Sequence, residues 1–197
     1  MRARRERRSE ANTGISILFT TARNRLLEYP DPAIAGRARK LFETAGEDRA
    51  KVVESYRDVA RMSGDASRGK RAFEENCARC HSAHRGVRVG PDLSGVNNKT
   101  KEELLNSILN PSAAIEPRFT NYIVTTKDGF VHDGVIASET PGIITLRNGS
   151  EEGNDPILRS NIVEVRASTI SLMPEGLEKA LNKQDLADVI AFLRGGT

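Results

Sequence analysis

The sequence lacks several of the patterns that identify common functional classes. Its apolar stretch at residues 15–19 is interrupted by Ser16, and it is too short for a membrane-spanning helix or for the apolar part of a secretion signal. It contains no glycine-rich phosphate-binding loop, and its serine, histidine and aspartate residues show no triad-like grouping. The 197 residues include only two cysteines and three histidines, which limits thiol chemistry and cysteine–histidine metal sites. We therefore expect no integral membrane span and no catalytic site of these kinds.

Charge of one sign is in excess only at the start of the chain. The formal net charge is +3, and the first eight residues hold five arginines against the single acidic residue Glu6. Such a run predicts a solvated tail, and we expect residues 1–20 to be disordered. The remaining chain is close to neutral and offers no nucleic-acid-binding fold, so we expect no nucleic-acid partner.

The two cysteines that are present stand together, in the pattern Cys77-x-x-Cys80-His81. One helical turn brings such thiols together, each can bond one vinyl group of a haem, and the histidine that follows can supply an axial imidazole to iron. A zinc site would need four ligands, usually from two separated pairs of residues. The candidates here, Cys77, Cys80, His81 and His84, lie in one short stretch and leave no second pair. A dithiol redox site would need a βαβ context. We predict one covalent haem c with its iron, and keep zinc and dithiol chemistry as alternatives.

A second axial ligand is sought among the other methionines and histidines. Met173 precedes Pro174 in a turn-like loop before the last predicted helix, so its thioether can be presented to iron. Met62 is expected to fill a gap in the core. His84 is too near the proximal histidine to reach the opposite haem face, and His132 is expected on the surface of a sheet. We predict Met173 as the ligand, with the two histidines as rivals.

Hydrophobic periodicity predicts a helical chain with a strand-rich insertion. Helices are expected in two short stretches within residues 22–44, on either side of Tyr29-Pro30-Asp31-Pro32, and over residues 47–62, 68–78, 101–109 and 183–194. The expected strands cover residues 119–127, 130–137, 143–146, 157–158 and 162–166, with hairpin turns at Asp128-Gly129 and Asn148-Gly149. We interpret residues 118–167 as a small antiparallel β-meander inserted between helices. Without it, Met173 lies at a separation from the haem motif that suits a compact haem domain.

One face of the helix before the cysteines is expected to meet the last helix. Gly69, Phe73 and Cys77 recur every four residues, so they share a face, and the glycine allows another helix to approach closely. The last helix has an apolar stripe with helical spacing. That stripe consists of Leu186, Val189, Ile190 and Leu193.

These residues resemble class I c-type cytochromes. The resemblance is carried by Gly69-x-x-x-Phe73-x-x-x-Cys77-x-x-Cys80-His81, Gly90-Pro91-Asp92-Leu93, Met173 and a last helix with Phe192. Residues 65–194 further resemble the C-terminal haem-binding domain of membrane-bound dehydrogenase-like proteins of planctomycetes and verrucomicrobia. The resemblance implies His81 as proximal ligand, Met173 as distal ligand and the Pro91 carbonyl as acceptor of a hydrogen bond from the His81 ring. It also implies that Phe73 and Phe192 lie near the crossing of the first and last helices.

The expected protein is therefore mainly α, a class I cytochrome c fold in residues 65–197 with a β insertion and a helical lead-in at residues 21–64. Its expected function is electron transfer by a haem with His/Met ligation, accepting electrons from a partner such as a dehydrogenase, and not catalysis. A haem-based sensor or peroxidase-like enzyme with a displaceable sixth ligand is the alternative. A third hypothesis makes the strand insertion an interaction surface, which leaves a homodimer open. Because haem c is attached outside the bacterial inner membrane, we expect a periplasmic or otherwise exported protein whose export signal belongs to a longer parent polypeptide.

Overall fold

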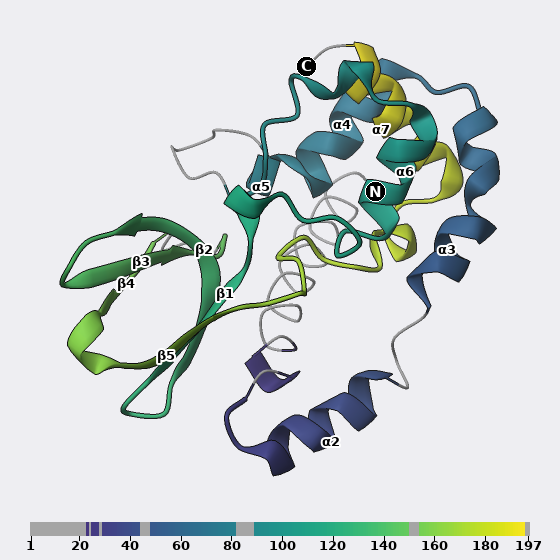
Figure 1. The fold of residues 1–197 in the computed structure, drawn as a ribbon. Helices are drawn as coiled ribbons and strands as arrows, with labels where there is room; N and C mark the ends of the chain where they lie inside the picture. Colours follow the sequence, from purple (N-terminus) through teal and green to yellow (C-terminus); the bar gives the residue numbers. More distant parts are fainter. Residues whose placement is uncertain are drawn as a thin grey trace, which may run out of the picture.

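The computed structural model describes residues 23, 25–27, 29–43, 48–81, 89–149 and 154–195. The predicted basic tail at residues 1–20 and the rival ligand His84 lie outside these residues. Figure 1 shows a group of helices on one side and a bent sheet on the other, with α5 on the side of the helical group that faces the sheet. No helix among the described ranges is long and apolar enough to cross a membrane.

The helices follow the predicted order. They are α2 (Pro32–Glu43), α3 (Arg49–Ser55), α4 (Ala66–Asn76), α5 (Ala78–His81), α6 (Lys101–Leu109) and α7 (Lys183–Gly195), with the 3-10 turns η1 (Arg57–Arg61), η3 (Val96–Asn98), η4 (Pro117–Phe119), η5 (Arg159–Asn161) and η6 (Leu177–Lys179). Helix α6 has the predicted bounds because Thr100 and Glu103 form a reciprocal capping box at its start. Helix α7 begins after Asn182, whose side chain accepts hydrogen bonds from the next turn.

Helices α4 and α7 pack against each other (Figure 1). A Cβ atom built on Gly69 would lie 1.9 Å from the carbonyl oxygen of Asp188, so no larger residue fits there without moving the helices. Beside the crossing, the rings of Phe73 and Phe192 pack with centroids 5.4 Å apart. Both expectations, the partner helix and the aromatic pair, are confirmed.

The predicted helix over residues 47–62 is interrupted, which corrects the sequence-based expectation. Helix α3 ends at Ser55, and the chain continues from Arg57 as the 3-10 turn η1. The break coincides with a contact from far along the chain: Lys183 donates a hydrogen bond to the carbonyl of Ser55, and its ammonium lies 5.2 Å from the centre of the Tyr56 ring. Val59, in η1, is buried in the main helical core, so this lead-in segment packs directly on that core.

The sheet has five antiparallel strands, and its order corrects the expected meander. The strands are β1 (Tyr122–Thr126), β2 (Val131–Glu139), β3 (Ile143–Arg147), β4 (Asp155–Leu158) and β5 (Ile162–Ala167), in the order β4-β3-β2-β1-β5. Four strands follow one another as predicted, but β5 crosses to the far edge and pairs with β1. This pairing covers an edge of β1 that a meander would leave open. The fold is thus a helical core joined to a sheet more elaborate than predicted.

Two separate hydrophobic clusters support these two parts. The helical cluster contains Phe73, Leu105, Leu109 and the stripe of α7. The sheet has its own cluster, formed by Val124, Ile144, Leu146 and Ile157. The sheet bends along β2, whose register shifts between Ile136 and Ser138. Each part therefore has an apolar interior of its own.

Candidate haem-binding site

The structure brings Cys77, Cys80 and His81 together in a single turn. Helix α4 ends at Asn76, and Cys77 caps it by donating its backbone N–H to the carbonyl of Phe73 at 2.8 Å. The backbone N–H groups of Cys80 and His81 then both donate to the carbonyl of Cys77, at 3.1 and 3.0 Å. Both cysteines are unpaired and half-buried. Two thiols and an imidazole are thus presented by one hydrogen-bonded turn.

The ring of His81 is oriented by the segment that follows the cysteine motif. Its Nδ1 lies 2.9 Å from the carbonyl oxygen of Pro91, the contact that the resemblance implies. A carbonyl can only accept, so Nδ1 carries the proton, and in the neutral ring the lone pair available to a metal is on Nε2. Gly90 makes this approach possible, since a Cβ atom there would lie 2.6 Å from Cε1 of the histidine. The backbone N–H of Gly90 also donates to the carbonyl of Cys80 at 2.9 Å, which fixes the segment against the turn.

The surroundings of the two thiols argue against dithiol redox chemistry. Burial, together with the neighbouring Cys80, raises the pKa of Cys77 to about 12, and burial also raises the pKa of Cys80. Reactive dithiols work in the opposite way, with a thiolate favoured by a lowered pKa. In the described part of the chain, no three His, Cys, Asp or Glu side chains cluster in a way that could hold a metal ion. Thiols buried beside an imidazole suit covalent attachment of an apolar cofactor.

Met173 lies on a different segment, the loop between β5 and η6. Its side chain is half-buried, and its backbone N–H donates to the hydroxyl of Ser171 at 3.1 Å. The backbone N–H of Ser171 donates in turn to the hydroxyl of Ser112, just after α6, at 3.2 Å. The loop ends at Gly176, whose φ of 86° is in the left-handed region that favours glycine. The loop is therefore held in place through its backbone on the methionine's N-terminal side.

The rival ligands in the described residues have other partners. Met62 packs against the helical core, as expected of a gap-filling residue. His132 is half-buried in β2, and its Nδ1 lies 2.6 Å from a carboxylate oxygen of Asp155. That contact joins β2 to the start of β4 across the bend of the sheet, rather than leaving the imidazole on an open sheet surface.

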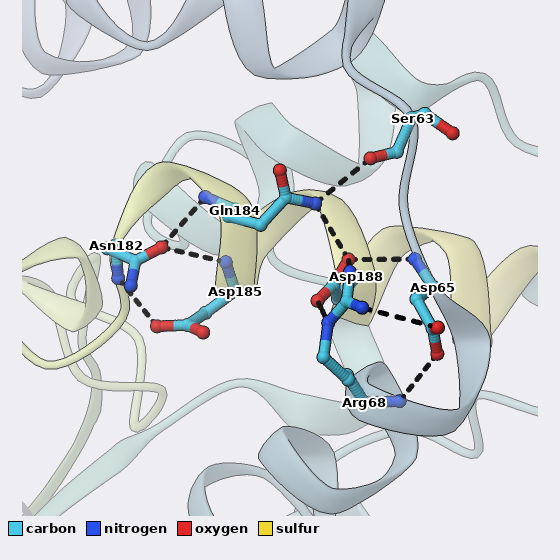
Figure 2. A network of polar contacts seen from close by, with 7 residues as sticks. All are labelled: Ser63, Asp65, Arg68, Asn182, Gln184, Asp185 and Asp188. Carbon is cyan, nitrogen blue, oxygen red and sulfur yellow. Dashed lines mark hydrogen bonds and ion pairs between the residues drawn. The ribbon is translucent and has the colours of Figure 1, made fainter.

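A buried carboxylate that the sequence did not reveal ties α4 to α7 (Figure 2). Asp188 of α7 is 1% exposed and accepts hydrogen bonds from the backbone of Asp65 at 2.7 Å and from the Arg68 guanidinium at 2.6 and 3.0 Å. The amide of Gln184 adds a further bond at 2.9 Å and also donates to the carbonyl of Ser63 at 3.0 Å. The N-terminus of α4 is thereby fixed on α7, and Cys77 follows the opposite end of the same helix.

The sheet also reaches the cysteine motif. Gly149, in the turn after β3, is so placed that a Cβ atom on it would lie 3.7 Å from Sγ of Cys80 and 3.4 Å from the side chain of Val89. The insertion therefore stands beside the turn that would carry the cofactor, which its position in the sequence alone does not predict.

A covalently attached haem fits the residues that are present. The two thiols are unpaired, the imidazole is held through Nδ1 and thereby offers Nε2, and a half-buried thioether is available on a loop tied to α6.

Comparisons with known proteins point in the same direction. Residues 64–123 match the family described as cytochrome c oxidase, cbb3-type, subunit III. A cytochrome c-553-like protein of Synechocystis sp. is 31% identical over 62 residues, which are 31% of this chain and 59% of that protein. A cytochrome c of Euglena viridis is 50% identical over 38 residues, 19% of this chain and 37% of that protein. The chain thus spans less than two thirds of either relative. These matches support a class I c-type cytochrome, and its cofactor is haem c, covalently bound, with its iron.

Proposed function

We propose that this chain is an electron-transfer protein in which Cys77 and Cys80 bond the haem through thioether links, and His81 and Met173 bind its iron from opposite faces. The observation that carries the proposal is the contact of His81 Nδ1 with the Pro91 carbonyl at 2.9 Å. This contact holds the imidazole in the tautomer and orientation that a metal ligand needs, next to two unpaired thiols. When bound, the haem supplies one-electron chemistry between ferrous and ferric iron.

The chain's own residues provide attachment, ligation and burial. Hydrogen bonds within the turn at the end of α4 and the contact with the Pro91 carbonyl restrain the imidazole, and a thioether as second ligand would raise the potential relative to two imidazoles. We extend the proposal to the organisation of the chain: residues 65–197 are the haem domain, residues 118–167 its insertion, and residues 21–64 a lead-in. The proposed partner is a redox protein such as a dehydrogenase, and the proposed compartment is one outside the inner membrane, where haem c is attached.

The test is the absorption spectrum of protein made with haem-attachment machinery and an export signal. We expect haem that resists acid extraction and, in the ferric form, the weak band at about 695 nm that marks an iron–methionine bond. Met173→Ala should abolish this band, whereas the matched control Met62→Ala, which alters a methionine packed on the core, should keep it.

Three results would contradict parts of the proposal. Protein without covalent haem would refute the role of the cysteines. A band that survives Met173→Ala would refute the sixth ligand. Carbon monoxide binding to the reduced protein at neutral pH would favour the sensor or peroxidase-like alternative, because it requires an open or easily displaced sixth position.

A further inference from the structure

We infer that Arg49, in the lead-in helix α3, is a positioning residue for the sixth iron ligand, because it clamps the loop that carries Met173 onto the end of α6. The inference rests on the proposed role of Met173. It concerns a residue outside the segment matched by the cytochrome family, residues 64–123.

The clamp is a buried, two-pronged ion pair. The two terminal nitrogens of the Arg49 guanidinium donate to the two carboxylate oxygens of Glu178, both at 3.0 Å. The side chains are 12% and 5% exposed, so solvent screens this pair far less than it screens a surface pair. Burial alone would raise the pKa of Glu178, but the hydrogen bonds from Arg49 and from the backbone outweigh it and hold that pKa below its ordinary value. The carboxylate is therefore ionised and engaged at neutral pH.

The third donor of the same guanidinium fixes the clamp to α6. Nε of Arg49 donates to the carbonyl oxygen of Leu109 at 2.7 Å. Leu109 is the last residue of α6, where helix carbonyls have no partner within the helix and where a cation is favourable. Arg49 thus joins the C-terminus of α6 to Glu178 directly.

The other end of the methionine loop is tied to the same place. Ser171 donates its backbone N–H to the hydroxyl of Ser112, three residues after Leu109. The segment from Ser171 to Glu178, which comprises the loop and the first two residues of η6, is therefore attached at both ends to one short stretch at the end of α6, with Met173 between the two attachments. Removing one attachment lengthens the free segment and lowers the fraction of time in which the thioether is placed for iron.

Two variants and one control separate positioning from general support. Glu178→Gln keeps the size of the side chain but removes its charge, and Arg49→Lys keeps a positive charge but cannot form three directed hydrogen bonds. Glu54→Gln is the matched control on the same helix, because Glu54 pairs with Arg57 at 2.7 Å in an exposed position.

The measurement is imidazole binding to the ferric holoprotein, followed by the loss of the 695 nm band. Imidazole competes with Met173, so its apparent Kd is inversely proportional to the fraction of protein whose methionine is off the iron. We expect an apparent Kd about tenfold lower for Glu178→Gln and Arg49→Lys, the effect of losing about one charged hydrogen bond. We expect no change for Glu54→Gln. Thermal melting of the same samples reports stability separately.

The outcomes distinguish this inference from the proposal on which it rests. A wild-type protein without the 695 nm band would refute Met173 as ligand and the clamp with it. If the wild type shows the band but both clamp variants bind imidazole as the wild type does, the clamp alone is refuted. This holds even if both variants melt at a lower temperature. If Glu54→Gln changes the affinity as much as the clamp variants do, the effect belongs to helix α3 in general, and the specific role of Arg49 is refuted.

Discussion

Replacing Asp188 by alanine tests whether the buried carboxylate in Figure 2 holds α4 against α7. The wild-type carboxylate accepts four hydrogen bonds, two of them from one guanidinium, while being 1% exposed. Removing one member of a buried charged network typically costs 3–5 kcal/mol, and we expect about 3 kcal/mol here because the Arg68 side chain is half exposed and can turn to solvent. For a chain of this length, that corresponds to a fall in Tm of about 6–12 °C.

The pH dependence of the same protein provides a second check. Burial would raise the pKa of Asp188, but the hydrogen bonds from Arg68, Asp65 and Gln184 outweigh it, so its pKa is lowered in the folded state. A carboxyl group with a lowered folded pKa contributes stability above its unfolded pKa, near 3.8, and this contribution is lost as the pH falls through the folded pKa. We therefore expect the difference between wild type and Asp188→Ala to be full at pH 7 and to shrink below about pH 4.

Urea unfolding of the holoprotein at pH 7 and at pH 3.5 measures both effects. Asp58→Asn is the matched control, because Asp58 also pairs with a cation of α7, Lys183 at 2.6 Å, but from an exposed position. We expect that variant to unfold as the wild type does. A loss of stability in Asp188→Ala no greater than that of the control, or one of equal size at both pH values, would refute the reasoning.

Two further predictions concern single buried positions. In Gly90→Ala the new methyl group would lie 2.6 Å from Cε1 of His81, so we expect the imidazole to be displaced. The variant should lose about 1–3 kcal/mol of stability and show a lower reduction potential in voltammetry. An unchanged potential would contradict this prediction. In Asp133→Asn we expect a gain of about 1 kcal/mol at pH 8, measured by urea unfolding, because burial raises the pKa of this fully buried carboxyl despite its bond to Arg25. A carboxyl group whose pKa is raised in the folded state makes the wild type less stable as the pH rises through that pKa. The gain in stability from Asp133→Asn should therefore be larger at pH 8 than at pH 4, and an equal gain at both pH values would contradict this prediction.

Local signals predicted the helices and one hairpin turn of the sheet well. The capping box of Thr100 and Glu103 fixes where α6 begins, and Asn182 fixes where α7 begins. The turn at Gly129, with φ of 84°, is where the hairpin motif places it. In each case the residues that decide the structure are within a few positions of one another, so the sequence contains the complete cause.

Contacts between distant residues account for what the sequence did not predict. The helix over residues 47–62 breaks where Lys183 reaches Ser55, a contact across 128 positions. The pairing of β5 with β1 joins strands that are far apart along the chain, and strand periodicity does not encode which edge of the sheet a strand joins. The clamp between Arg49 and Glu178 joins two charged residues 129 positions apart, each of which looks like an ordinary surface residue in its own segment.

The separation of the two hydrophobic clusters leads to a final prediction about what the sheet contributes to the haem site. Leu146 in the sheet and Leu109 at the end of α6 are both 0% exposed, so Leu→Ala at either position should cost about 2–5 kcal/mol. Of the two residues, only Leu109 has a carbonyl that accepts a hydrogen bond from Arg49. We therefore expect Leu109→Ala alone to lower the apparent Kd for imidazole. Hydrogen exchange should show faster opening of the strands in Leu146→Ala while the helices keep their protection. If Leu146→Ala changes imidazole affinity as much as Leu109→Ala does, the sheet helps to hold the sixth ligand, and its turn at Gly149 beside Cys80 would be the contact through which it acts.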